Sequence, residues 1–392
     1  MSQAASDVTA PRPLSGYKYF DQLDGLLTPL RPAGTQRDKA GNRHLFFDQY
    51  AQLLLLYFFN PAVTTLRGVQ QFTTLEKVQR VFGIRPTALG SLSEAARVFD
   101  PALLEPVIAE LAQRALAQPG ARPPEDRQAL AGLIAVDGSL LPALPRMAWA
   151  LWQDATHRAA KVHVAFAVWP GTPVRATVTA GNASERDELR RMAKPGEFYV
   201  MDRGYVEYDL LRELDTAGVR FVQRLLDNCV YEVVAENSLT AADHQAGVVR
   251  DVTVRRLGTD KHNALLERPL RVVETRGEEP GECWVLATNA LTLPAELVVL
   301  AYRHRWLVEL FFRWLKCILG CRHLVLNHQA GVTLQVYLAI IASLLIGLWT
   351  GAKPSKRTYE MLCHYFNGWA TAEEVERCLD TFKAKRAPPS KH

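Results

Sequence analysis

Four residues in the last third of the chain have types and spacing that could do chemistry. Residues 302–316 read YRHRWLVELFFRWLK, in which Tyr302, Arg305, Glu309 and Lys316 are separated by two, three and six residues. At about 100° per residue, the four side chains would share one narrow stripe of a helix. Their neighbours are mostly apolar, so the rest of the helix would be buried. A carboxylate beside two cations and a phenol suits a metal ion together with a phosphate.

The spacing also has an ordinary explanation. Arg305 and Glu309 stand four residues apart and could form part of a row of ion pairs on a helix. Two upstream aspartates favour the chemical interpretation, because Asp137 follows the apolar run LIAV and Asp202 follows FYVM. Short apolar runs of this length are typical of buried strands. Either aspartate alone would be typical of a strand end or a turn.

Together, the Tyr-x2-Arg-x3-Glu-x6-Lys spacing and the two aspartates resemble the DDE transposases of bacterial insertion sequences, in the branch named after insertion sequence 4. The resemblance spans roughly residues 130–330 and includes the run KVHVAFAVWPGTPVRATVTAGNASERDEL. It implies that Asp137, Asp202 and Glu309 are the three catalytic carboxylates. It also implies that they hold two ions of Mg²⁺, or Mn²⁺ in its place.

This chemistry needs carboxylates of this kind. Cutting and rejoining DNA is an in-line displacement at phosphorus, in which two divalent ions activate the attacking oxygen and stabilise the leaving oxygen. Mg²⁺ takes oxygen ligands and keeps several waters, so a few carboxylates suffice. Three carboxylates without cations would raise one another's pKa. We therefore expect Asp137, Asp202 and Glu309 to meet in one metal-sized cluster.

The resemblance assigns DNA contacts to the other members of the stripe. Arg305 offers a bidentate fork for a phosphate, Lys316 a point charge, and Tyr302 a hydrogen-bond donor or a stacking face. Trp306 either stacks at the DNA end or packs in the core. In relatives that form DNA hairpins, a tryptophan equivalent to Trp284 holds a flipped base, although a strand tryptophan is also a common core residue.

Other candidates have weaker support. Alternation along KVHVAFAV places Lys161 and His163 on one strand face, either near the metals or at a solvated strand edge. Arg203 and Arg224 are further candidates for phosphate contacts. Cys317 and Cys321, with His323 nearby, look like half of a zinc site, but the second half is missing, and we prefer thiols without a metal.

Composition permits DNA binding without demonstrating it. The chain has 392 residues, 48% hydrophobic residues and a net charge of +5. Six cysteines without a paired framework favour a reducing compartment, and the resemblance implies the cytoplasm of a bacterium. The N-terminus lacks the features of a signal peptide. The longest apolar run, Val336–Trp349, is shorter than the ~18 residues of a membrane span, which predicts a buried core helix and no membrane partner.

The order of patterns predicts an α/β protein. The resemblance implies a ribonuclease H-like mixed sheet with a β-rich insertion, preceded by a helical N-terminal domain. We expect a disordered tail (1–16), DNA-end-binding helices (17–117), a linker (118–126), the catalytic core (127–228 and 291–350), a β insertion (229–290), C-terminal helices (351–382) and a basic tail (383–392). Within the N-terminal helices, Ser91 with Glu94 suggests a capping box, and Asp100 with Pro101 suggests a helix start.

The function that follows from the resemblance is metal-dependent cut-and-paste transposition. Water would cut at the ends of the element, and the freed 3′-hydroxyl would then attack target DNA. The partners would be the terminal inverted repeats and target DNA, bound by a dimer when two ends are synapsed. The alternatives are a catalytically inactive, domesticated DNA-binding protein and a structure-specific nuclease of the same fold.

Overall fold

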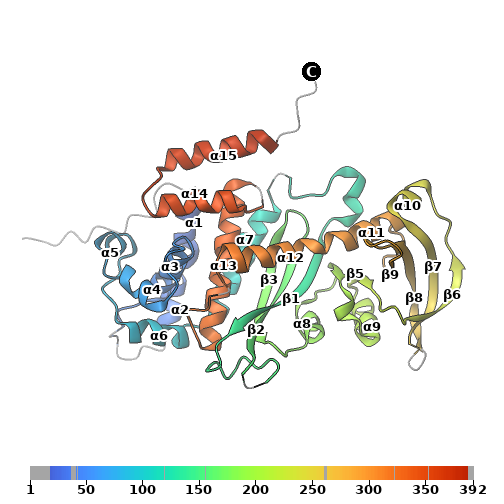
Figure 1. Ribbon diagram of the computed structural model, residues 1–392, viewed down its shortest axis with the longest axis horizontal. Helices are drawn as coiled ribbons and strands as arrows, with labels where there is room; N and C mark the ends of the chain where they lie inside the picture. The colour runs from blue at the N-terminus through green and yellow to red at the C-terminus, as the bar shows by residue number, and fades with distance from the viewer. Residues whose placement is uncertain are drawn as a thin grey trace, which may run out of the picture. The chain divides into compact units, whose positions relative to one another are not determined.

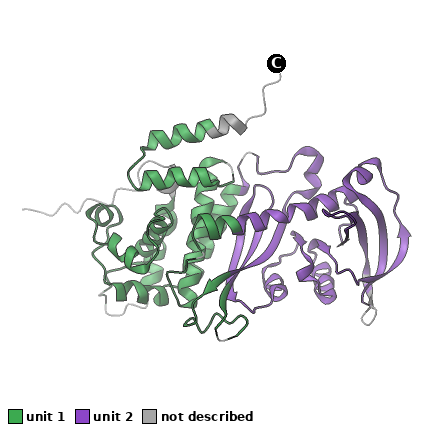
Figure 2. Cartoon of the chain, in the orientation of Figure 1, with its two compact units in different colours: residues 1–115, 141–160, 313–392 green, residues 116–140, 161–312 purple. Residues whose placement is uncertain are grey.

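A computed structural model describes residues 18–386, except 37–40, 42, 119, 155, 260–262, 322 and 352. The predicted N-terminal tail, residues 1–16, lies outside the described residues, as do residues 387–392 of the predicted basic tail. The first four residues of that predicted tail continue the last helix, α15 (Ala372–Arg386). The chain divides into two compact units (Figure 2).

Unit 1 combines residues 1–115, 141–160 and 313–392 and is largely helical (Figures 1 and 2). Asp100 caps a 3₁₀ turn as expected, accepting a hydrogen bond from the Ala102 N–H at 3.0 Å. The expected capping box at Ser91 is wrong, because the helix already begins at Leu89. The helices of this unit, besides α15, are α1 (Lys18–Leu27), α2 (Leu30–Thr35), α3 (Phe47–Phe58), α4 (Leu66–Phe72), α5 (Glu76–Phe82), α6 (Leu89–Val98), η1 (Pro101–Leu104), α7 (Glu105–Leu116), η4 (Trp314–Ile318), α13 (Gln329–Thr350) and α14 (Lys356–Phe366).

Helix α13 is the core element of unit 1. It is long and apolar enough to cross a membrane by length and composition, but 94% of its most apolar stretch is buried. A helix that is apolar all round belongs inside a protein core, and α13 packs against α1, α3, α6 and η1. The predicted burial of this segment is confirmed. Its packing also places residues 313–350 with the N-terminal helices, which differs from the predicted core boundary at 350.

One nine-stranded mixed sheet organises the rest of the chain. The strand order is β3-β2-β1-β4-β5-β9-β8-β7-β6. Neighbours β1, β4 and β5 are parallel, whereas β5 pairs with β9 antiparallel. The predicted mixed α/β class is confirmed. The strands are β1 (Leu133–Ala143), β2 (Arg158–Ala167), β3 (Thr172–Ala180), β4 (Phe198–Met201), β5 (Arg220–Arg224), β6 (Val230–Glu236), β7 (Val248–Gly258), β8 (Asn263–Arg276) and β9 (Cys283–Thr288).

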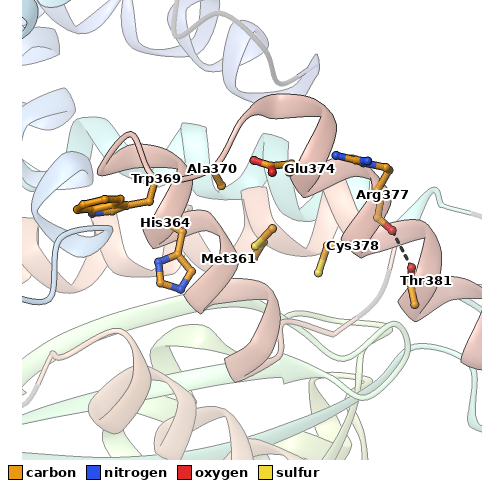
Figure 3. Close-up of a pocket in the computed structure, with 8 residues that line it drawn as sticks. All are labelled: Met361, His364, Trp369, Ala370, Glu374, Arg377, Cys378 and Thr381. Carbon is orange, nitrogen blue, oxygen red and sulfur yellow. Dashed lines mark hydrogen bonds between the residues drawn. The ribbon is translucent and has the colours of Figure 1, made fainter.

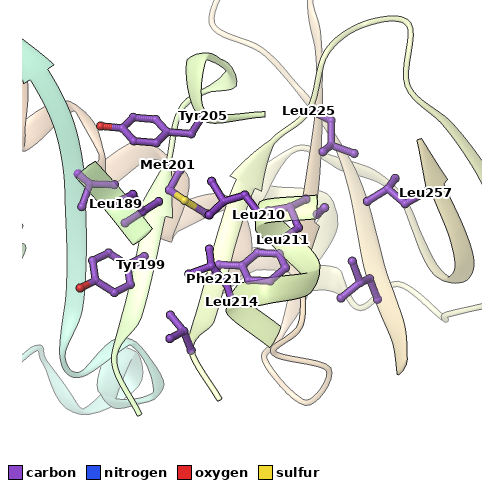
Figure 4. Packing of buried hydrophobic residues seen from close by; sticks show 14 of the residues in the cluster. Leu189, Tyr199, Met201, Tyr205, Leu210, Leu211, Leu214, Phe221, Leu225 and Leu257 are labelled. Carbon is purple, nitrogen blue, oxygen red and sulfur yellow. The ribbon is translucent and has the colours of Figure 1, made fainter. Parts of the chain in front are cut away.

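Helices cover both faces of the parallel strands in unit 2, which contains residues 116–140 and 161–312. Helices α8 (Glu185–Met192) and α9 (Tyr208–Thr216) supply leucines that pack on Tyr199, Met201 and Phe221 (Figure 4). The alternate residues Val200 and Val222 are fully buried as well. Because successive side chains point to opposite faces, they face the other side, where α11 (Ala295–His304) contacts β4 and β5.

The β insertion continues the same sheet. Its strands β6–β9 form an antiparallel meander whose last strand pairs with β5. The insertion also contains a short helix, α10 (Ala241–Ala246), which sequence patterns did not indicate. Asp243 of α10 accepts a hydrogen bond from the Glu296 N–H at 2.9 Å in the first turn of α11. The insertion is therefore attached to the helix that leads towards Glu309.

A buried ion pair makes a second attachment. The Arg271 guanidinium in β8 donates to Asp251 in β7, with an Nε–Oδ1 distance of 2.7 Å. Their side chains are 10% and 3% exposed. Arg271 also donates to the carbonyls of Leu291 and Leu293, just before α11. Breaking a buried pair on one side leaves a charge in the interior without its partner.

We therefore predict that Asp251→Ala lowers the free energy of unfolding by about 3–5 kcal/mol, measured by thermal or urea denaturation. The control is Glu232→Gln, which removes a carboxylate that pairs with Arg255 and Arg256 on exposed faces of β6 and β7. Exposed pairs contribute little, so the control should melt like the native chain. Equal melting of both variants would show that the Arg271 pair does not anchor the insertion.

Candidate active site

Strand register brings Asp137 and Asp202 together. Ala135 of β1 stands opposite Val200 of β4 in a parallel pair. Two residues further along the chain come Asp137 in β1 and Asp202 just after the end of β4. Adjacent strands lie about 4.8 Å apart, and residues opposite one another point to the same face. The two carboxylates are therefore neighbours at the carboxyl ends of the two apolar runs.

Local turns hold both aspartates. The Oδ1 of Asp137 accepts a hydrogen bond from the Gly138 N–H at 2.8 Å. Asp202 caps the 3₁₀ turn η3 (Arg203–Tyr205), accepting from the Gly204 N–H at 2.9 Å. The carbonyl of Asp202 accepts from the Gln223 side chain in β5 at 2.5 Å. Backbone N–H groups thus hold one oxygen of each carboxylate.

Burial and the neighbouring charges shift the pKa of Asp137. Burial raises it first, the charge of Asp202 raises it further, and Glu185 adds to the effect. The Gly138 N–H and Arg305 lower it, and the net result is a pKa of about 7. A divalent cation would relieve the same repulsion. The carboxylate donors of Asp137 and Asp202 therefore fit a hard cation such as Mg²⁺ or Mn²⁺.

Glu309 is linked to the two aspartates indirectly, through Arg305. It lies on α12 (Trp306–Arg313), and its Oε1 is 2.6 Å from the Arg305 guanidinium. Arg305 in turn interacts electrostatically with Asp137 and Asp202. Among the residues that the structure describes, no three Asp, Glu, His or Cys side chains form a group that could hold a metal. The meeting of all three carboxylates in one cluster therefore stays a prediction.

The remaining members of the stripe lie in different settings. Tyr302 is 6% exposed, and its ring meets that of Trp284 edge-on, with 5.1 Å between the centroids. Lys316 lies in η4, a π-helical turn, where hydrogen bonds span five residues instead of four. The assumed 100° per residue does not hold in such a turn. The single stripe predicted for all four residues therefore stays a prediction at Lys316.

The two tryptophans differ in exposure. Trp284 is 6% exposed, and besides the Tyr302 contact, the Arg224 guanidinium lies 5.3 Å from its ring centroid. Arg224 pairs with Glu282 at 2.9 Å. Trp306 is 50% exposed and open to a ligand. The structure thus favours the packing interpretation of Trp284 and leaves Trp306 available for DNA.

The weaker candidates are largely engaged within the protein. His163 is fully buried, and its Nε2 lies 2.8 Å from the Thr179 hydroxyl, which itself donates to the Ala180 carbonyl. Burial lowers the pKa of His163 to about 4, so the ring stays neutral. Lys161 pairs with Glu185 at 3.3 Å. Cys317 is exposed and Cys321 is buried.

Two residues near the aspartates were not predicted from the sequence. Glu185 and Tyr205 both interact electrostatically with Asp137. Burial, together with the nearby carboxylates, raises the pKa of Tyr205 well above its ordinary value, so its hydroxyl remains a donor. Tyr205 stands three residues after Asp202, which could have been a signal. Glu185 had none, because its contact with β1 depends on long-range packing.

A pocket of about 550 Å³ lies between α14 and α15 in unit 1 (Figure 3). Its lining contains none of the predicted site residues. It consists of Met361, His364, Trp369, Ala370, Glu374, Arg377, Cys378 and Thr381. This pocket is separate from the candidate active site, which we locate from the strand register and the ion pairs described above.

Comparison with known families identifies the family of this chain. A family model described as the transposase DDE domain matches residues 129–345, more than half of the chain. The chain belongs to this family. The match includes Asp137, Asp202 and Glu309, and the predicted membership of the DDE transposases is confirmed.

Curated relatives of this DDE transposase-domain protein carry related names. "Putative transposase y4zB" of Sinorhizobium fredii is 29% identical over 268 residues, which cover 67% of this chain and 72% of the relative. "Probable transposase for insertion sequence element IS5377" of Geobacillus stearothermophilus is 27% identical over 213 residues, 54% of this chain and 55% of that protein. A solved piggyBac transposase synaptic complex with hairpin DNA aligns with a TM-score of 0.44 and 12% identity, over 98% of this chain and 87% of that one.

The raised pKa of Asp137 predicts a pH dependence of stability. Between about pH 4 and pH 7 the folded protein keeps a proton that the unfolded chain has lost. The free energy of unfolding therefore falls as the pH rises through this window. Asp137→Asn cannot ionise, so it should match the native chain near pH 4 and exceed its stability above pH 7, by up to about 4 kcal/mol at 1.36 kcal/mol per pKa unit.

The measurement is thermal melting in EDTA across this pH range. Asp209→Asn is the control, because Asp209 is an exposed carboxylate on α9 that pairs with Arg212. A stability difference between Asp137→Asn and the native chain that stays constant at every pH would contradict the raised pKa.

Proposed function

We propose that this protein is a cut-and-paste transposase that acts on the ends of its own insertion element. The observation that carries the proposal is the adjacency of Asp137 and Asp202 within the DDE family match. The names of the two curated relatives support it. The Tyr302, Arg305, Glu309 and Lys316 spacing supports the branch named after insertion sequence 4.

In this proposal the three carboxylates hold the metal. Asp137 and Asp202 would be its first ligands, and Glu309 would join when Arg305 releases it for a DNA phosphate. Two divalent ions would activate the attacking oxygen and stabilise the leaving oxygen. The Arg305 guanidinium has the planar fork that suits a phosphate. It pairs with Glu309 and interacts electrostatically with Asp202, so an arriving phosphate would find a cation near these carboxylates.

The fold supplies the other parts of the proposal. The strands β1, β4 and β5 would form the ribonuclease H-like core, with the helices of residues 17–117 binding the DNA ends. Synapsis of two ends would require a dimer, acting in the bacterial cytoplasm on the inverted repeats and on target DNA. Trp306 would contact the DNA end through its exposed face.

We predict that Asp137→Ala, Asp202→Ala and Glu309→Ala each abolish cleavage while leaving end binding largely intact. The reason is that the carboxylates act on the scissile phosphate and contribute little to DNA affinity. The assay uses linear duplexes ending in the DNA that flanks the coding sequence in its source genome. Mg²⁺ or Mn²⁺ should support cutting, and Ca²⁺ should support binding alone.

The control for this series is again Asp209→Asn, which should cut like the native chain. Appreciable cleavage by Glu309→Ala in Mg²⁺ would remove Glu309 from the site. The same assay on the native chain distinguishes the alternative functions. Strand transfer identifies a transposase, cutting without transfer a nuclease, and binding alone an inactive relic.

A further prediction separates the two tryptophans. Trp284→Ala should lower stability by about 3–5 kcal/mol, because it empties a buried space between Arg224 and Tyr302. Trp306→Ala should melt like the native chain but lose about 1–3 kcal/mol of DNA binding if a base stacks on it. Denaturation and gel-shift titrations measure the two effects. A stable Trp284→Ala protein that nicks normally but fails at the second strand would restore the base-stacking role of Trp284.

A further inference from the structure

Gln223 is a buried polar residue that contacts the backbone of Asp202. It lies in β5, and its side chain is fully buried. Its Nε2 donates to the Asp202 carbonyl at 2.5 Å and to the Arg224 carbonyl at 2.7 Å. One side-chain amide thus joins the backbone of Asp202 to the backbone of the neighbouring strand.

This contact lies where the pairing of β4 with β5 ends. The last pair in register is Met201 with Gln223, and Met201 is also the last residue of β4. Asp202 then caps the turn η3, so it lies beyond the regular strand. Asp137, in contrast, lies within β1, which continues to Ala143. Of the two aspartates, Asp202 is therefore the one that a side chain ties to the sheet.

The other end of the same amide is an independent observation. Within the part of the chain that the structure describes, the Oε1 of Gln223 is buried and has no hydrogen-bond partner. A buried acceptor without a partner destabilises the folded state, and an apolar side chain of similar size would avoid this cost. Turning the amide over would place Oε1 against two carbonyl oxygens, so the orientation of the amide is fixed. Such a residue calls for an explanation other than stability.

We propose that Gln223 is a positioning residue for the cation site, and that it holds the Asp202 backbone so that the Asp202 carboxylate stays beside Asp137. This inference rests on the proposed function. The Asp202 carbonyl also accepts from the Tyr205 N–H at 3.2 Å, but that bond lies within the turn. The Gln223 bond ties the turn to β5. Its loss would leave the turn closed and free to shift against the sheet.

The test is a titration of the full-length, DNA-free chain with Mn²⁺, in which electron paramagnetic resonance measures the free ion. Gln223→Met keeps an unbranched side chain of similar length and removes both donors, so we expect about 10-fold weaker Mn²⁺ binding. Gln223→Asn keeps the amide on a shorter side chain that does not bridge both carbonyls. It should weaken Mn²⁺ binding too, and it serves as the test if the Met variant does not fold.

Gln335→Met is the matched control. Gln335 is another fully buried glutamine, on α13 in unit 1, and its Nε2 donates to the His323 carbonyl at 2.8 Å. The substitution removes a bond of the same kind from a place without the aspartates. It should lower the melting temperature and leave Mn²⁺ affinity unchanged, which is the result that a purely structural role of Gln223 would also give.

Native-like Mn²⁺ affinity in a folded Gln223 variant would overturn the proposal, and so would a native chain that binds no Mn²⁺. The proposed function fails separately. A native chain that binds Mn²⁺ but neither cuts nor joins DNA would refute transposition, while the Mn²⁺ titration would still decide the role of Gln223.

Discussion

The parallel register of β1 and β4 is the constraint on which the site depends. It pairs Ala135 with Val200, and two residues later the chain reaches Asp137 and Asp202, whose charges repel each other. Nearby cations offset this repulsion. Arg305 interacts electrostatically with both aspartates, and Lys161 pairs with Glu185.

The second organising feature is the link between the β insertion and the helix that carries Glu309. Asp243 contacts the first turn of α11, and Arg271 binds the carbonyls just before it. Trp284 of β9 meets Tyr302 near the other end of the same helix. These contacts attach α11 to the insertion at both of its ends. Arg305 directly follows α11, so its position depends on these contacts.

Much of the fold and of the candidate site was predictable from local sequence patterns. Apolar runs ending in Asp137 and Asp202 indicated the strands, and the Glu309 spacing indicated the family. Three features depended on information that local sequence lacks. The π turn at Lys316 breaks a regular helical phase, Trp284 is covered by residues distant in the chain, and Glu185 reaches Gly138 only after α8 packs on the sheet. Periodicity describes one element at a time, whereas these features arise between elements or from a departure from ideal geometry.

The antiparallel pairing of β9 with β5 has a consequence for how this insertion could change length during evolution. Because β9 must run opposite to β5, and β6 through β9 alternate in direction, losing a single strand would reverse the chain as it leaves β5. Losing β6 and β7 together would let β8 follow β5 in the direction that β6 now takes. Viable shortening or growth would therefore proceed by whole hairpins at the outer edge, while β9 persists in every version.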